Sequence, residues 1–108
     1  MLHELRIYHC APGKLGEVNK RFASATLALF KKHGIKQIGF WTTLIGPSNL
    51  DLYYILEWES LADREIKWSA FQADPEWHKE KAETELNGAL VNSFENIMLT
   101  PTTYSALR

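Results

Sequence analysis

The stretch DLYYILEW, residues 51–58, decides the fold class because neither of its faces is polar. Successive side chains of a strand point to opposite sides of a sheet. One side of this strand carries large apolar side chains, namely Leu52, Tyr54, Leu56 and Trp58. The other side carries Tyr53 and Ile55, so a strand with this sequence is predicted to be covered on both faces.

The composition indicates one folded domain over residues 1–108, with a tail from about residue 101. Hydrophobic residues make up 45% of the chain, and four Trp, four Tyr and five Phe supply large side chains for a single core. Charged residues of both signs are interspersed and the net charge is -1, which argues against nucleic acid as a partner. No run of about 20 apolar residues occurs, so no membrane insertion is predicted.

The cysteine content favours a reducing compartment. Cys10 is the only cysteine, so it cannot form an internal disulfide. No basic segment followed by an apolar segment opens the chain. These features predict a cytoplasmic protein, or a mitochondrial one if a targeting segment has been removed.

Alternating and helical patterns predict four strands and three helices. The strands are expected at residues 2–9, 35–45, 51–58 and 92–100, and the helices at residues 14–33, 61–73 and 75–86. Gly34 ends the first helix, Ser60 is an N-cap for the second, and Asp74 followed by Pro75 starts the third. The two helices that follow the third strand are expected to form together the crossover to the fourth strand.

This order of elements predicts an α+β fold of the ferredoxin-like βαββαβ type. Right-handed crossovers place the helices on one face of a four-stranded antiparallel sheet and leave the other face without cover. Four strands make a face of roughly 19 by 18 Å. If it is apolar and uncovered, this face is at or beyond the largest apolar patches that soluble monomers expose. We therefore predict a homodimer through the sheet face, which is the dimeric α+β barrel arrangement.

The short loop at residues 46–49 predicts the register of the second and third strands. If this loop sets the register, Trp41 pairs with Tyr54 on one face of the sheet. Arg6 and Tyr8 of the first strand are expected on the same face, which is the face away from the helices.

Five residues of that face are candidates for binding a small lipophilic or aromatic ligand: Arg6, Tyr8, Trp41, Tyr54 and Trp58. Aromatic side chains with a few polar groups are typical of small-molecule pockets. A second interpretation is that the same residues form a plain dimer interface. Arg6 would then be paired with a carboxylate, the candidates being Glu4, Glu57 and Glu95.

The sequence predicts no metal site, no cofactor and no assignable catalytic residue. His3 and His9 are about 20 Å apart along a strand, too far to hold one ion. His9 and Cys10 are neighbours in a strand and point to opposite faces, so they do not form a catalytic pair. The charges of the last helix are expected on a solvated surface, with Lys81 and Glu85 paired.

Four motifs in order resemble those of the NIPSNAP family. They are ELRIYHCAPGKLGE at residues 4–17, HGIKQIGFWTTLIGPSN at 33–49, WESLADR at 58–64 and ADPEW at 73–77. The resemblance spans nearly the whole chain and includes Leu99, Pro101 and Ser105 near its end. It implies a single NIPSNAP-like domain with a ferredoxin-like fold and a dimeric α+β barrel.

The resemblance to this family implies a protein without established catalytic activity, so whether the chain is an enzyme stays open. The first hypothesis is a small-ligand-binding or interaction module that uses the barrel cavity. The alternative is a cofactor-free monooxygenase or isomerase acting on a small aromatic or lipophilic compound. In that case Arg6 would polarise an oxygen and Tyr8 or Tyr54 would exchange a proton.

Overall fold

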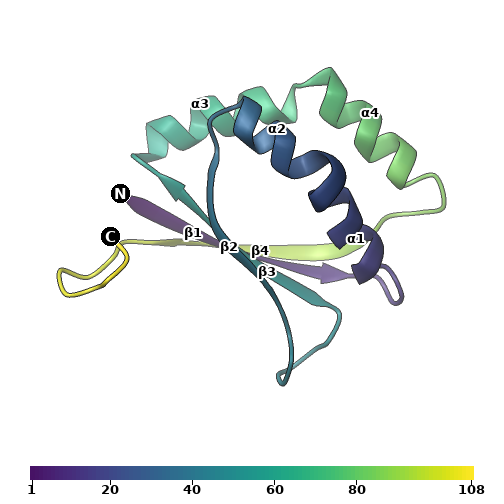
Figure 1. Ribbon diagram of the computed structural model, residues 1–108, viewed down its shortest axis with the longest axis horizontal. Coiled ribbons are helices and arrows are strands. Elements are labelled where there is room, and N and C mark those ends of the chain that lie inside the picture. Colours follow the sequence, from purple (N-terminus) through teal and green to yellow (C-terminus); the bar gives the residue numbers. More distant parts are fainter.

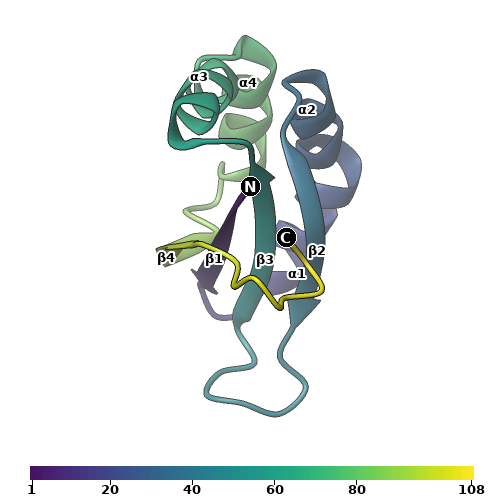
Figure 2. The same cartoon turned by 90° about the vertical axis from the view of Figure 1, so that its left-hand side faces the viewer.

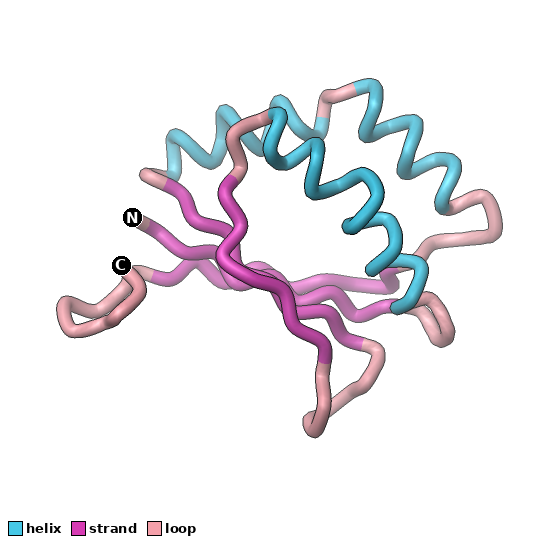
Figure 3. The backbone as a smooth tube through the Cα atoms, viewed as in Figure 1, coloured by secondary structure: helices cyan, strands magenta, loops and turns pink.

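The computed structural model describes all 108 residues and consists of a helical layer packed on one side of a sheet (Figure 1). The strands are β1 (Leu2–Cys10), β2 (Lys36–Thr42), β3 (Asp51–Trp58) and β4 (Val91–Leu99). The helical segments are α1 (Leu15–Arg21), η1 (Phe22–Thr26), α2 (Leu27–Lys32), α3 (Leu61–Gln72) and α4 (Pro75–Thr84). The two layers are separate in Figure 3, and the predicted α+β, ferredoxin-like fold is confirmed.

The sheet has the strand order β2-β3-β1-β4, and each neighbouring pair is antiparallel. The two central strands are β3 and β1, which explains why β3 is apolar on both faces. Figure 2 shows β4 at one edge of the sheet, on the side of α3 and α4, and β2 at the other edge, on the side of α2. β4 is therefore an edge strand, and it lies on the side of the sheet where α3 and α4 are found.

Side-chain caps fix two helix starts, as predicted. Ser60 Oγ accepts a hydrogen bond from the backbone N–H of Asp63 at 3.0 Å. The Asp74 carboxylate accepts one from the backbone N–H two residues later at 2.8 Å, and it also accepts hydrogen bonds from Lys32 and His33. Asp74 thus joins the end of α2 to the start of α4. No helix has both the length and the apolar character needed to cross a membrane.

The first predicted helix contains one segment of π-helix. This segment, η1, joins α1 to α2 without an intervening loop. A π turn holds an extra residue, so it rotates the side chains that follow it. The buried stripe consequently continues from Val18 and Phe22 to Thr26 and Phe30, whereas Ala25 is only half-buried.

The register of β2 and β3 differs from the prediction by one residue. Tyr54 pairs with Phe40, and Trp41 pairs with Tyr53. The connection spans residues 43–50 and β2 contains a bulge near its start, so a tight loop does not set the register. Trp41 therefore lies on the face opposite to that of Tyr54.

The core lies between the helices and the face of β3 that carries Tyr54 and Trp58. The buried helical side chains of this core are Val18, Phe22, Leu29, Phe30 and Phe71. Arg6 and Tyr8 point to the same side, because they pair with Tyr54 and Leu52 in the β1–β3 ladder. The predicted placement of Arg6, Tyr8, Tyr54 and Trp58 on the uncovered face is thus wrong.

The reason for this inversion is that β1 buries its charged side chains and turns its aliphatic ones outward. Glu4 and Arg6 are buried on the helix side, where they form an ion pair. Leu5 and Ile7 pair with Ile55 and Tyr53 on the other face of the sheet, which no helix covers. We call this second face the open face.

Candidate functional site

A connected group of polar side chains lies between the sheet and α3, and we call it the Glu4 network. Its members come from all of β1, β3, β4 and α3: Glu4, Arg6, Tyr8, Tyr54, Trp58, Arg64 and Asn96. Neighbouring strands place these residues side by side, because Glu4, Arg6 and Tyr8 alternate along β1 and all point to the helix side.

The carboxylate of Glu4 is the centre of this network and has no exposed surface. It accepts hydrogen bonds from Arg6 Nη1 at 2.9 Å, Trp58 Nε1 at 3.0 Å and Asn96 Nδ2 at 2.7 Å. It also accepts two from Arg64, through Nε at 2.8 Å and Nη2 at 3.0 Å. Burial by itself would raise the pKa of Glu4, but the Arg64 hydrogen bonds and the charge of Arg6 lower it to about 2.

The guanidinium of Arg6 lies among aromatic rings. Its carbon Cζ is 4.5 Å from the centre of the Trp68 ring, 5.5 Å from that of Phe94 and less than 6 Å from those of Tyr8 and Tyr54. Such contacts stabilise a cation through the negative face of the ring. Burial would lower the pKa of Arg6, but Tyr54, Tyr8 and Glu4 together raise it, so the group stays charged.

Two tyrosine hydroxyls extend the network away from Glu4. Arg6 Nε donates to the hydroxyl of Tyr54 at 2.7 Å, and this hydroxyl lies 2.8 Å from that of Tyr8. Tyr54 is fully buried, and burial raises its pKa well above the usual value. Tyr8 is only half-buried and is therefore nearer to solvent than Tyr54.

The helix side of β4 is the place where the network comes closest to the surface. Phe94 pairs with Tyr8 in the β1–β4 ladder, and their ring centres are 6.1 Å apart. Phe94 and Met98 are exposed although they point toward the helical layer, because no helix packs tightly on this strand. The edge strand thus leaves one side of the network uncovered.

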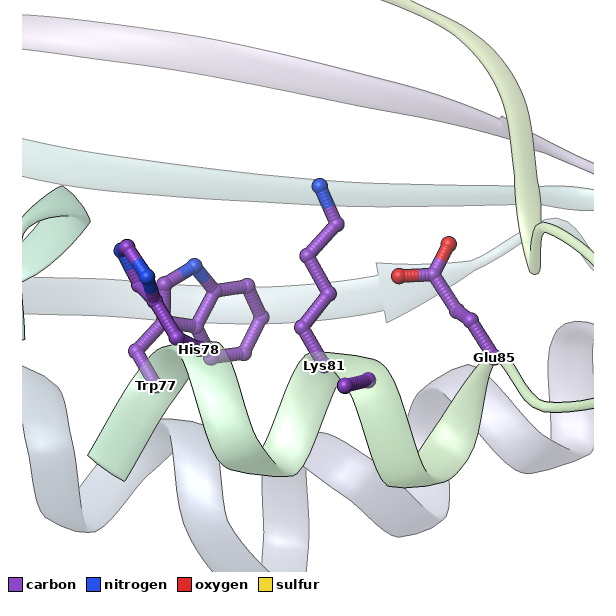
Figure 4. Close-up of a pocket in the computed structure, with 5 residues that line it drawn as sticks. Trp77, His78, Lys81 and Glu85 are labelled. Carbon is purple, nitrogen blue, oxygen red and sulfur yellow. The ribbon is translucent and has the colours of Figure 1, made fainter. Parts of the chain in front are cut away.

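One face of α4 carries an open hollow of about 430 Å³. It is lined by Trp77, His78, Lys81, Ala82 and Glu85. Figure 4 shows that Lys81 and Glu85 extend from the helix in the direction of the strands. The predicted pair of Lys81 and Glu85 is absent, because Glu85 instead lies 3.6 Å from Arg21 Nη1. The ammonium group of Lys81 has no ion-pair partner.

Four of the five predicted ligand-binding residues come together, but not in the predicted cavity. Arg6, Tyr8, Tyr54 and Trp58 belong to the Glu4 network, and no cavity of the structure is lined by Arg6, Tyr8 or Tyr54. Trp41 is on the open face, half exposed. Its ring lies over Gly39, where an added Cβ would be only 2.9 Å from it.

Sequence reasoning named Glu4 only as one possible partner of Arg6, and it is the one that Arg6 contacts. It missed Arg64, Asn96 and Trp68, which reach the network from α3 and β4. The signal available in the sequence was the pair of opposite charges at alternate positions of a strand. Such a pair shares one face and can be buried together.

The open face is apolar in its centre and polar at its two ends. Leu5, Ile7, Tyr53 and Ile55 form the centre together with Ile97 of β4. His3 lies 3.3 Å from Glu57 at one end of β1, and His9 lies between Asp51 and Glu95 at the other, at 2.8 and 2.7 Å. No group of three or more His, Cys, Asp or Glu side chains has the arrangement of a metal site.

The low pKa of Glu4 predicts that the network loses its stabilising effect in acid. The pKa of about 2 lies below the ordinary value of 4.5, so the folded state resists protonation and its stability falls as the pH drops from about 4.5 toward 2. In Glu4→Gln the fall over this range should be shallower, and the protein should be less stable at pH 7 by about 3–5 kcal/mol. Urea unfolding between pH 7 and pH 3 measures both effects; parallel pH curves for the two proteins would contradict this role of Glu4.

Comparisons with known proteins agree with the motifs and with the fold. The sequence profile of the NIPSNAP family matches residues 3–106. A NIPSNAP family protein from Agrobacterium tumefaciens has a crystal structure with a TM-score of 0.88 and 29% identity, over 99% of this chain and 98% of that one. A NIPSNAP domain protein from Burkholderia xenovorans gives a TM-score of 0.83 at 22% identity, over 97% and 98% of the two chains.

A more distant similarity concerns the fold alone. A putative antibiotic biosynthesis monooxygenase from Deinococcus radiodurans has a TM-score of 0.62 at 12% identity, over 100% of this chain and 99% of that one. A search of curated proteins finds no match. The family profile covers nearly the whole chain, and the chain therefore belongs to the NIPSNAP family.

Proposed function

We propose that this chain is a small-ligand-binding protein that works as a homodimer. The ligand site lies on the helix side of the sheet, between β4 and α4, where the Glu4 network approaches the surface. The observation that carries this proposal is the charged Arg6 guanidinium, buried among four aromatic rings next to an uncovered strand edge. Small-molecule sites are typically lined by aromatic side chains with a few placed polar or charged groups.

A binding role explains these buried charges better than a purely structural role does. Replacing a buried ion pair by packed apolar side chains is often neutral or stabilising, so stability alone is weak support for retaining two arginines and a glutamate. Tyr8 is half-buried and Phe94 is exposed on the uncovered side of the network, and α4 carries a hollow lined by Trp77 and by polar side chains. These properties favour a compound with an aromatic or lipophilic body.

A second candidate function is a cofactor-free monooxygenase or isomerase. The observation that favours it is the pair of Tyr8 and Tyr54 hydroxyls at 2.8 Å, held next to the Arg6 cation. A tyrosine hydroxyl in such a position can exchange a proton with a bound substrate. Turnover of a bound compound would favour this alternative, and its recovery unchanged after incubation favours the binding protein.

The four tryptophans provide a direct test of the ligand site. Small aromatic fragments should shift the indole N–H signals of Trp68 and Trp77 in ¹H–¹⁵N NMR spectra, because these rings lie next to the proposed site. Trp41 is the internal control, since it lies on the open face. Shifts confined to Trp41, or no shifts with any fragment at millimolar concentration, would contradict the proposed location.

The homodimer part of the proposal rests on the open face. No helix covers this side of the sheet, and Trp41, Ile97 and Leu99 remain 41–51% exposed there. Together with the half-buried centre of the face they form a continuous apolar surface on four strands. A two-fold related copy has the same surface and could cover it with no other partner.

A single charge on the open face should separate the protomers. Ile97→Glu places a carboxylate on the exposed edge strand, and it should convert the dimer to a monomer at micromolar concentration by leaving that charge unpaired in the interface. Ile66→Glu is the matched control, because Ile66 is 73% exposed on α3 and lies on the helical side. Light scattering gives the mass of each variant, and a monomeric wild-type protein would contradict the dimer.

A further inference from the structure

The charges of the Glu4 network do not balance. Two guanidinium groups, those of Arg6 and Arg64, share the single carboxylate of Glu4. The other members, including Tyr8 and Tyr54, are neutral side chains, and burial raises the pKa of Tyr54 so that it keeps its proton. The network therefore has a net charge of one positive unit, most of it buried.

Arg6 also has hydrogen-bond donors that could bind a negatively charged group. A guanidinium has five N–H donors. Arg6 uses Nε toward Tyr54 and Nη1 toward Glu4, and the amide nitrogen of Asn96, its partner residue on β4, is directed to Glu4. The guanidinium therefore has donors left for a further acceptor, and a carboxylate is the acceptor that a guanidinium binds most strongly.

The second wall of the site has a similar excess of positive charge. Lys81 extends from α4 toward the strands and has no ion-pair partner. The carboxylate on the same wall, Glu85, lies 3.6 Å from Arg21, which offsets its charge. An anion between β4 and α4 would thus meet positive groups on both sides.

Phe94 stands between Arg6 and solvent. Arg6 is only 4% exposed, whereas Phe94 is 60% exposed and has its ring centre 5.5 Å from Arg6 Cζ. A side chain with so little packing can change its rotamer at low cost, and exposed side chains do so on the picosecond to nanosecond timescale. Rotation of Phe94 would open a path to Arg6 along the uncovered edge of the sheet.

We infer that the site binds a small aromatic carboxylate, whose anionic group reaches Arg6 when Phe94 turns away. The ring of the ligand then lies against Tyr8, Trp68 and Phe94, and Lys81 adds long-range attraction. This inference rests on the proposed ligand site and adds the chemical class of the ligand. A flat ligand is expected because aromatic rings surround Arg6. A single negative charge is expected because the network has one excess positive charge.

The test compares 2-naphthoate with 2-naphthamide, which has the same shape and no charge, by titration calorimetry on the wild-type protein. Naphthoate should bind at least about tenfold more tightly, the difference expected for a charge-assisted pair, and its affinity should fall with added salt. Equal affinities would overturn the anion inference and leave the ligand site standing. Failure of both compounds to bind would overturn the inference and the proposed site together.

Variants then assign the preference to its residues. Arg6→Met should abolish the preference for naphthoate. If Arg6→Met does not fold, Arg6→Lys is tested instead; it keeps the charge and should retain only part of the preference. Lys81→Met should weaken naphthoate binding by a few fold, whereas Lys79→Met, on the opposite side of α4, should not.

Phe94→Ala should speed association of naphthoate in stopped-flow fluorescence. An unchanged preference in the folded Arg6 variants, or an unchanged rate in Phe94→Ala, would overturn the assignment.

Discussion

The burial of one carboxylate, that of Glu4, organises the helix side of this protein. An isolated charge in this position would be strongly destabilising, so the surrounding elements must bring donors to it. Arg6 comes from the same strand, Trp58 from β3, Asn96 from β4 and Arg64 from α3. One buried group thereby fixes the relative positions of three strands and a helix, and it holds Arg6 under the helical layer.

The two faces of the sheet have separate properties that follow from the same alternation. Because β1 turns its charged side chains inward, its aliphatic side chains Leu5 and Ile7 remain for the open face. The helix side then carries a positively charged group among aromatic rings, and the open face carries an apolar surface. In the proposed function, ligand binding and self-association therefore occupy opposite sides of one sheet.

The sequence was sufficient for the element order and the fold, because these depend on local signals such as Ser60, Asp74 and the apolar stretch of β3. It was not sufficient to decide which face of the sheet the helices cover. That choice depends on Glu4 and Arg64, which are 60 residues apart and whose contact no local pattern reveals. The predicted pairing of Trp41 with Tyr54 was wrong for a related reason, since a one-residue change of register gives Trp41 the partner Tyr53, whose side chain is on the other face.

A double-mutant cycle measures how strongly Glu4 and Arg64 stabilise each other. It compares Glu4→Gln, Arg64→Met and the double variant in urea unfolding at pH 7. If the buried carboxylate ties α3 to the sheet, the coupling free energy should exceed about 1 kcal/mol, within the range found for residues in one network. The partly exposed pair of Asp63 and Lys67 within α3 is the reference, with an expected coupling of about 0.2–0.5 kcal/mol. Additive effects of Glu4→Gln and Arg64→Met, with a coupling no larger than that of the reference pair, would contradict the central role of Glu4.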